Sequence, residues 1–359
     1  MFLSSPLLLR AACALLSAAL FTRFLTPSAE SLALRLGAMD LPGEKRKVHT
    51  RATPRLGGVA IAAGFFAAAL AFTAPRTALS GVLRGALLVA LMGAADDCRT
   101  LRSPLKLAVQ LIAALLAWRA GARIDVLTLP FAGQRFAELG ELSLPLTLLW
   151  MLACTNAVNL IDGLDGLAAG MAAIGSGSLL LVAAAVGERE IAVLLAALAG
   201  SCLGFLPFNR CPARIFMGDT GSQLLGYLLG AASTLGMFKS HAALSFFVPL
   251  LALALPLFDT VFAFFRRALH GKNPLAADRG HIHHRLLDCG LRQREAVGLL
   301  CAVSALLGLT AAALAAKGDA ARLLAALLMT AAAAFALALI RARACAARRR
   351  RRLQQDHGA

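Results

Sequence analysis

Long apolar runs separated by short polar loops dominate the chain. A membrane-spanning helix needs about 20 apolar residues, and ten or eleven runs of about this length follow one another. The predicted spans are 5–25, 56–74, 79–95, 105–120, 143–160, 164–187, 190–208, 218–237, 242–266, 295–316 and 320–341. The first run lacks a small-residue cleavage site, which favours a span over a signal peptide. The pattern predicts an all-α polytopic integral membrane protein.

Composition supports this fold class. Of the 359 residues, 59% are hydrophobic and only 15% are charged, whereas soluble domains carry about 25% charged residues. Between the fourth and fifth predicted spans, residues 123–145 alternate apolar and polar positions around a Gly-Gln turn. This alternation predicts a short β-hairpin on the outer, periplasmic face.

The net charge of +17 allows the orientation of the spans in the membrane to be predicted. With the N-terminus outside and eleven alternating spans, most of the 36 Lys and Arg residues fall in inner segments, as the positive-inside rule requires. The prediction is one transmembrane domain over residues 1–344, with inner loops 26–55, 96–104, 156–165, 209–218 and 267–294. The basic tail 345–359 is interpreted as a topology signal that contacts anionic lipid, rather than as a nucleic-acid-binding segment.

Carboxylates are scarce, and those near the spans collect at the inner side. They are Asp96, Asp97, Asp162, Asp165, Asp219 and Asp259. Helix capping could explain Asp165 or Asp219 singly. It does not explain Asp96 and Asp97, because they end a predicted helix, where the macrodipole disfavours negative charge. Ionisable residues near a membrane are costly and mark functional sites, so the six carboxylates predict a shared cation-binding cleft.

Basic groups and histidines lie in the same inner loops. Residues 39–61 combine a Lys-Arg-Lys cluster with His49, and residues 273–291 hold His281, His283 and His284. The tight spacing of these three histidines argues against a closed tetrahedral zinc site, and imidazole groups facing a phosphate are favoured. Carboxylates beside cations suit a magnesium–diphosphate substrate. The membrane location predicts a lipid as the second substrate.

Six motifs follow one another between about residues 39 and 291. They read DLPGEKRKVHTRATPRLGG, GAADDCRTLRSPLKLAVQ, NAVNLIDGLDGLAAG, FNRCPARIFMGDTGSQLLG, PLFDTVFAFFRR and DRGHIHHRLLDCGL. Each is weak evidence alone, but in this order they are specific. With them the chain resembles the polyprenyl-phosphate N-acetylhexosamine-1-phosphate transferases, the WecA and MraY group of glycosyltransferase family 4 type.

The resemblance implies an activity and its partners. Such enzymes transfer a sugar-1-phosphate from a UDP-N-acetylhexosamine to undecaprenyl phosphate at the cytoplasmic face of the bacterial inner membrane, with Mg²⁺ or substituting Mn²⁺, and release UMP. The product initiates a cell-envelope polysaccharide. HIHHRLLD lacks the Phe-Glu that follows the histidines in the pentapeptide-transferring branch, which favours the N-acetylglucosamine branch. Membrane lipid and a homodimer are further implied partners; nucleic acid is not.

Residue roles are also implied by the resemblance. Asp219 and Asp96 match the metal site, and the catalytic set is Asp96, Asp97, Asp162 and Asp165. The substrate-binding set is Lys47, His49, Arg55, Lys106, Asn156, Asn159, Asn209, Arg279, His281, His283 and His284, with Gln110 one helical turn after Lys106.

Several alternatives stay open. Asp96 could accept a proton in a direct attack by the lipid phosphate, or an aspartate could carry a phospho-sugar intermediate. The substrate could be another UDP-N-acetyl sugar or the pentapeptide-bearing one. An ion transporter is disfavoured, because it predicts mid-span charges and inverted repeats, whereas the charges here crowd at one face.

Overall fold

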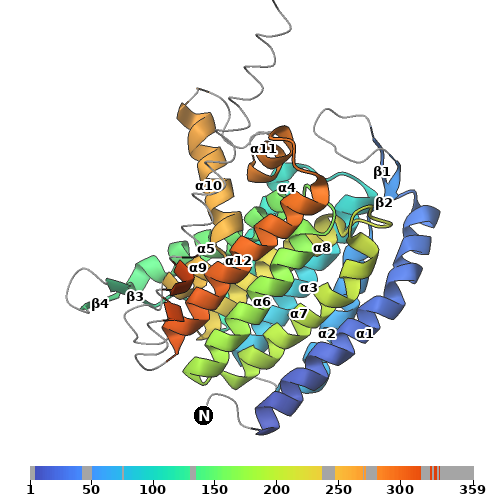
Figure 1. The fold of residues 1–359 in the computed structure, drawn as a ribbon. Coiled ribbons are helices and arrows are strands. Elements are labelled where there is room, and N and C mark those ends of the chain that lie inside the picture. Colours follow the sequence, from blue (N-terminus) through green and yellow to red (C-terminus); the bar gives the residue numbers. More distant parts are fainter. Residues whose placement is uncertain are drawn as a thin grey trace, which may run out of the picture.

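Helices occupy each predicted span up to residue 316 and lie side by side in a bundle (Figure 1). This computed structural model describes residues 5–42, 51–74, 77–129, 135–236, 247–269, 271 and 281–316, with a few positions between 324 and 331. The basic tail 345–359 and most of the predicted span 320–341 lie outside these residues. The helices are α1 Ser5–Leu36, α2 Gly57–Phe72, α3 Thr77–Cys98, α4 Ser103–Arg119, η1 Gly140–Leu142, α5 Ser143–Ile161, α6 Leu167–Val186, α7 Arg189–Asn209, α8 Gly218–Gly236, α9 Phe247–Ala252, α10 Ala254–Leu269, α11 Ile282–Asp288 and α12 Gln293–Ala315.

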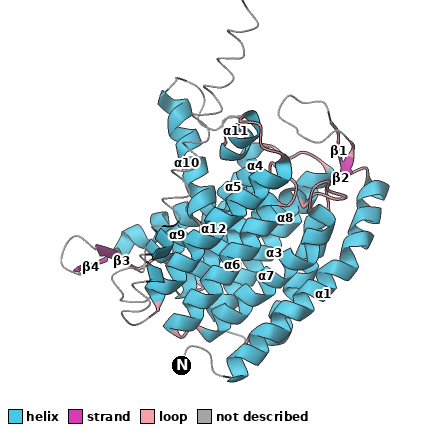
Figure 2. Ribbon diagram, viewed as in Figure 1, coloured by secondary structure: helices cyan, strands magenta, loops and turns pink. Residues whose placement is uncertain are grey.

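Two small antiparallel pairs of strands accompany the helices (Figure 2). β1, Met39–Asp40, pairs with β2, Thr53–Pro54, next to the end of α1. β3, Val126–Leu129, pairs with β4, Arg135–Glu138, between α4 and α5, where the sequence predicts a hairpin. The side of the membrane on which this second pair lies stays a prediction.

The all-α membrane fold is confirmed by the helices themselves. Within the described part of the chain, six helical segments are long and apolar enough to cross a membrane. They are Pro6–Leu36, Thr77–Cys98, Gly140–Ile161, Leu167–Val186, Arg189–Asn209 and Gln293–Ala315. The apolar helix α2 is shorter. The predicted total of ten or eleven spans remains a prediction.

Several predicted boundaries differ from the structure. The predicted inner loop 26–55 begins too early, because α1 continues through Pro27 to Leu36. The last turns of α1 contact the rest of the protein: Ala33 is buried, and Glu30 pairs with Arg214 at 3.0 Å. The predicted span 242–266 is divided into α9 and α10. The loops 96–104 and 156–165 also begin within helices, since α3 runs to Cys98 and α5 to Ile161.

Alternating helix directions bring many helix ends to one end of the bundle. α3, α5 and α7 end there, and α4, α6, α8 and α12 begin there, as the hydrogen bonds between these ends show. α8 packs against α2, α3, α5 and α6 at the centre. The first turn of α8 approaches α3 closely because residue 93 is glycine; a Cβ there would lie 2.5 Å from the Cα of Thr220. The fold therefore sets the aspartates of α3 and α8 beside each other.

A partly buried ion pair lies at the opposite end of the bundle. Arg10 in α1 and Glu190 in α7 lie 2.8 Å apart, and Arg10 also donates to the carbonyl of Phe72 at the end of α2. Glu190 accepts a further hydrogen bond from the amide of Ala74. These contacts join α1, α2 and α7 at this end of the bundle, away from the aspartates of α3 and α8.

Candidate active site

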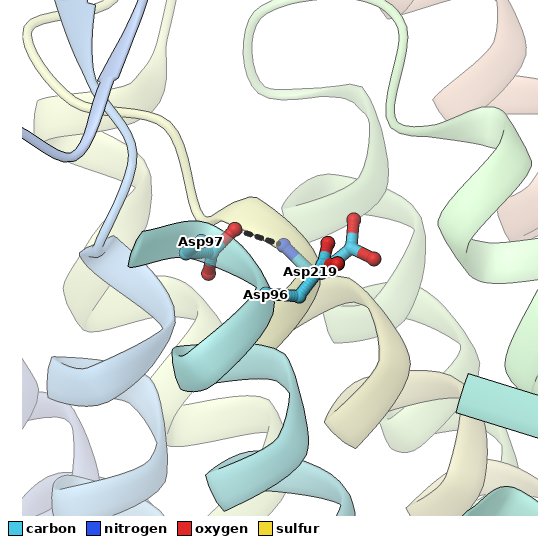
Figure 3. A group of neighbouring side chains, drawn as sticks. All are labelled: Asp96, Asp97 and Asp219. Carbon is cyan, nitrogen blue, oxygen red and sulfur yellow. Dashed lines mark hydrogen bonds between the residues drawn. The ribbon is translucent and has the colours of Figure 1, made fainter. Parts of the chain in front are cut away.

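Asp96 and Asp219 come from different helices and share one ammonium group. Lys106 Nζ donates to Asp96 Oδ2 at 2.8 Å and to Asp219 Oδ2 at 2.9 Å. Asp96 is 5% exposed, and its other oxygen accepts a hydrogen bond from the amide of Leu101. Figure 3 shows the carboxylates of Asp96 and Asp219 side by side. The predicted grouping of these three residues is therefore present in the fold.

Asp97 faces away from this pair and holds the first turn of α8. Its Oδ1 accepts the amide of Asp219 at 2.9 Å (Figure 3), and its Oδ2 accepts the amide and the hydroxyl of Thr220 at 3.0 and 2.6 Å. The amides at a helix N-terminus lack partners within the helix and favour a negative charge. Gly218, at φ +65°, leads the chain into this turn. Asp97 thus caps α8 from another helix and orients Asp219.

Arg55 binds the end of α3 in the complementary way. Its Nε donates to the carbonyl of Asp97 at 3.0 Å, and its Nη2 donates to that of Asp96 at 3.4 Å. A cation at a helix C-terminus is favoured by the macrodipole, and it offsets the unfavourable placement of two aspartates there. The structure brings Arg55 to the site through backbone contacts.

A chain of amide side chains leads from Asp219 into the bundle. Gln223 donates to Asp219 at 2.7 Å, Gln110 donates to Gln223 at 2.9 Å, and Asn156 donates to Gln110 at 3.0 Å. Asn159 accepts from Ser222 at 2.9 Å. Sequence reasoning missed Thr220, Ser222 and Gln223. The signal that could have found Gln223 is its position four residues after Asp219, on the same helix face.

The loop after α5 contributes two carboxylates with different surroundings. Burial, reinforced by the charges of Asp219, Asp97 and Asp165, raises the pKa of Asp162 to about 8. Asp165 instead accepts the amide of Ala213 at 3.0 Å.

Asn209, at the end of α7, joins the same two loops as Asp165. It accepts the amide of Gly166 and donates to the carbonyl of Ile215, both at 3.0 Å. Asp165 and Asn209 therefore fasten residues 162–166 to residues 210–217. Their predicted catalytic and substrate-binding roles stay predictions.

The histidines form a second cluster at the start of α11. Asp259 of α10 contacts His281 Nδ1 at 2.9 Å and accepts the amide of Ile282 at 2.8 Å. The rings of His281 and His283 stack with centroids 5.8 Å apart, and those of His283 and His284 lie 4.3 Å apart. Burial lowers the pKa of His283 to about 3, helped by the neighbouring His284, so this imidazole is neutral at physiological pH. The residues Lys47, His49 and Arg279 lie outside the described part of the structure.

The aspartate cluster suits a divalent cation. One ligand oxygen from each of Asp96, Asp97 and Asp219 lies within 4.8 Å of the others, and Mg²⁺ prefers oxygen ligands, one or two of them carboxylates. The Lys106 ammonium already bridges two of these carboxylates, which shows that a cation fits between them. Because Asp97 is committed to the amides of α8, Asp96 and Asp219 are the better-placed ligands.

Known proteins resemble this chain over most of its length. The family model described as glycosyl transferase family 4 matches residues 79–237. A probable undecaprenyl-phosphate N-acetylglucosaminyl 1-phosphate transferase of Bacillus subtilis is 41% identical over 81% of both chains. A decaprenyl-phosphate N-acetylglucosaminephosphotransferase of Mycolicibacterium smegmatis is 38% identical over 79% of this chain and 77% of its own. The undecaprenyl-phosphate alpha-N-acetylglucosaminyl 1-phosphate transferase of Escherichia coli is 29% identical over 82% of this chain and 81% of its own.

Proposed function

Because the chain belongs to glycosyl transferase family 4, we propose that it transfers N-acetylglucosamine-1-phosphate from UDP-N-acetylglucosamine to undecaprenyl phosphate. The relatives at 41% and 29% identity carry the names of undecaprenyl-phosphate N-acetylglucosaminyl 1-phosphate transferases. The product would be the lipid-linked diphosphate sugar that initiates a cell-envelope polysaccharide. An assay can test the sugar and the lipid acceptor of this proposal separately.

One observation carries the proposal: two buried or half-buried carboxylates from α3 and α8 share a single ammonium group. The Lys106 ammonium group donates one hydrogen bond to Asp96 and one to Asp219. This arrangement leaves negative charge in excess, and a diphosphate donor arriving with a divalent cation would supply the missing positive charge. Phosphoryl transfer depends mainly on positioning and on charge neutralisation, which is the chemistry these groups provide.

The proposed cofactor is Mg²⁺, with Mn²⁺ as a substitute. Asp219 and Asp96 would hold it, and Asp97 would keep Asp219 in place through the amide of that residue. When bound, the ion would neutralise charge on the diphosphate. Lys106 would then be free to contact a phosphate oxygen, because it would no longer be needed between the two carboxylates.

The proposed reaction is a direct displacement. An oxygen of the lipid phosphate attacks the phosphorus that carries the sugar, the bond from this phosphorus to the bridging oxygen breaks, and UMP leaves with that oxygen. Asp96 accepts the proton that remains on a fraction of the lipid phosphate. The alternative is a two-step route in which an aspartate oxygen attacks first. Sugar-phosphate label retained on purified protein before the lipid acceptor is added would favour the two-step route.

The setting of the site fits a membrane enzyme. The chain is an integral membrane protein by its apolar helices and its family. We infer that the aspartate-bearing end faces the cytoplasm of a bacterial inner membrane, because the positive-inside rule favours it: within the described residues, this end carries Arg55, Lys106, Arg210, Arg214 and Arg294. α10 stands away from the bundle (Figure 1) and exposes Phe258, Phe262 and Phe265, an apolar face suited to a prenyl chain.

The experiment that tests this function is an assay of the purified full chain with undecaprenyl phosphate and a panel of UDP-sugars. Release of UMP and formation of the lipid-linked product with UDP-N-acetylglucosamine would support the proposal. Turnover of a different UDP-N-acetyl sugar at higher kcat/KM would move the chain to a sibling activity. Turnover of the pentapeptide-bearing sugar alone would contradict the choice of branch.

A further inference from the structure

A groove separate from the aspartate cluster opens between α6, α7 and α12. α6 lies between α7 and α12 in the bundle (Figure 1). The groove has a volume of about 760 Å³, and neither Asp96, Lys106 nor Asp219 lines it. The residues that matter for its chemistry are Leu206, Arg210, Arg294, Val297, Gly298 and Cys301. It begins at the helix ends that also bear the aspartates.

Arginines surround the mouth of this groove. Arg210 is exposed, and its side chain forms no hydrogen bond or ion pair within the part of the chain that the structure describes. Arg294 donates twice to the carbonyl of Cys211, at 3.0 and 2.7 Å. Arg214 pairs with Glu30, but its side chain remains 63% exposed. Among the residues that line the groove, Asp165 is the one carboxylate, and it accepts the amide of Ala213. The mouth therefore carries a net positive charge.

Below the arginines the groove becomes apolar. Leu206 of α7 and Val297 and Cys301 of α12 line it, together with glycines of α6 and α12. A Cβ placed on Gly298 would meet nothing within 4 Å, so the groove is open at that position. From Arg294 to Cys301, α12 rises by about 10 Å at 1.5 Å per residue. The groove thus joins a basic mouth to a roughly 10 Å apolar wall.

We propose that this groove binds an anionic phospholipid, with its phosphate against Arg210 and Arg294 and an acyl chain along the apolar wall. Basic pockets between transmembrane helices at the cytoplasmic side are typical sites for anionic lipid headgroups. A zwitterionic lipid carries its own positive charge beside the phosphate, and it gains less from the arginines. The phosphate of the acceptor must reach Asp96 and Asp219, which do not line this groove, so the occupant is a structural lipid and not the substrate.

The first test is a titration of the full chain, in phosphatidylcholine nanodiscs, with phosphatidylglycerol, with bound lipid counted by native mass spectrometry. Arg210→Gln should weaken phosphatidylglycerol binding about five-fold, which is the 1 kcal/mol expected per arginine near a membrane surface. The matched control is Arg35→Gln, at the exposed end of α1 on the same end of the bundle. It should leave the affinity unchanged.

The second test fills the groove without touching its charge. Gly298→Leu should reduce bound phosphatidylglycerol at least about five-fold, comparable to the loss of one arginine. Gly177→Leu is the control, since a Cβ there also meets nothing within 4 Å and this glycine does not line the groove. Equal effects of the two leucines would overturn the proposal.

Two further results would assign the groove to another occupant and overturn the proposal. One is a change of oligomeric state in Gly298→Leu with lipid binding intact, which would mean that a second copy of the chain covers the groove. The other is displacement of phosphatidylglycerol by undecaprenyl phosphate in Asp219→Ala, which would make the groove part of the acceptor site. Equal affinity for phosphatidylcholine and phosphatidylglycerol would also contradict it.

Discussion

The aspartate cluster of α3 and α8 and the histidine cluster of α10 and α11 satisfy their carboxylates in opposite ways. In the first, Asp96 and Asp219 draw on one Lys106 ammonium. In the second, Asp259 has two partners of its own: it accepts the amide of Ile282, and its other oxygen contacts the ring of His281. The first cluster has two carboxylates for one ammonium group, and the second has one carboxylate with a separate partner for each oxygen.

This difference predicts different functional roles for the two clusters. A carboxylate pair that shares one cation gains from binding a second. The raised pKa of Asp162 comes first from its burial and then from the negative charges of Asp219, Asp97 and Asp165. The buried Asp259–His281 pair fixes the position of α11, because contacts to both oxygens of Asp259 hold the start of this helix. We expect changes in the aspartate cluster to affect metal and turnover, and changes in the histidine cluster to affect binding of the donor.

The largest effect is expected for Asp219→Ala. It removes a proposed metal ligand and the partner of both Lys106 and Gln223. Turnover should fall by at least about 10³-fold, the upper range for losing one transition-state charge contact. The measurement is UMP release by purified protein, with Asp125→Asn as a control variant outside the site. Activity within ten-fold of the unmodified protein would remove Asp219 from the site.

Asp96→Asn should lower turnover by about 10²- to 10³-fold, the range for loss of one group that stabilises charge in the transition state. The pH dependence then distinguishes its two proposed roles. A phosphate monoester has a second pKa of about 6, so an acceptor that is already deprotonated needs no base. If Asp96 is the base, the loss should shrink between pH 6 and pH 8. An equal loss at both values would leave only metal binding as its role.

Asp97→Asn should have a smaller effect, because Asp97 acts through the position of Asp219. In the variant, the side-chain amide group has one acceptor oxygen fewer for the first turn of α8. We expect a 10- to 100-fold fall in kcat, as for groups that orient metal ligands. Thr220→Val removes only one hydrogen bond of Asp97, the one from the Thr220 hydroxyl. The resulting fold-decrease in kcat should be about a tenth of that in Asp97→Asn. A purely structural role would lower the amount of folded protein without changing kcat or the Mn²⁺ affinity.

His284→Ala tests the other cluster. We expect KM for the UDP-sugar to rise about ten-fold, equivalent to one hydrogen bond, with kcat within a few-fold. His284 is 7% exposed, so folded protein must be verified by its melting temperature. A fall in kcat with unchanged KM would place His284 in the chemical step, and no change in either would take it out of the donor site.

The smallest effect is expected for Asp162→Asn. With a pKa of about 8, Asp162 is mostly protonated at pH 7 and becomes charged as the pH rises through 8. The charged form favours a nearby cation, so the Mg²⁺ affinity of the unmodified protein should increase by about two- to ten-fold from pH 7 to pH 9. The variant should lose this increase. The measurement is the Mg²⁺ concentration for half-maximal turnover at each pH; a parallel increase in both proteins would contradict the assignment.

Much of the fold and the centre of the site could be predicted from the sequence. Apolar runs of span length force helices in lipid. Two aspartates at a helix C-terminus are unfavourable for the helix dipole and therefore pointed to contacts with other parts of the chain or with a cation. The end of α1 was harder, because Glu30 and its neighbouring serines have the composition of a loop. Their helix is stabilised by residues far along the chain, such as Arg214, and a local pattern does not contain that contact.

The division of labour inside the Asp96–Asp97 pair was also beyond the sequence. Both residues match the same motif, but only the fold shows that Asp97 turns to the amides of Asp219 and Thr220, 122 and 123 residues later. Arg55 is similar: the resemblance implies substrate binding, which stays a prediction, and only the fold shows that Arg55 binds the carbonyls at the end of α3. Such roles depend on which helix ends meet, and that is a property of the packed bundle.

The most direct test of the account is Mn²⁺ binding to the purified full chain, followed by electron paramagnetic resonance with Mg²⁺ as competitor. We predict one Mn²⁺ per chain, displaced by Mg²⁺, lost in Asp219→Ala and retained in Asp259→Asn. Loss of the ion in Asp259→Asn together with retention in Asp219→Ala would contradict the account, because it would put the cation in the histidine cluster and not between α3 and α8.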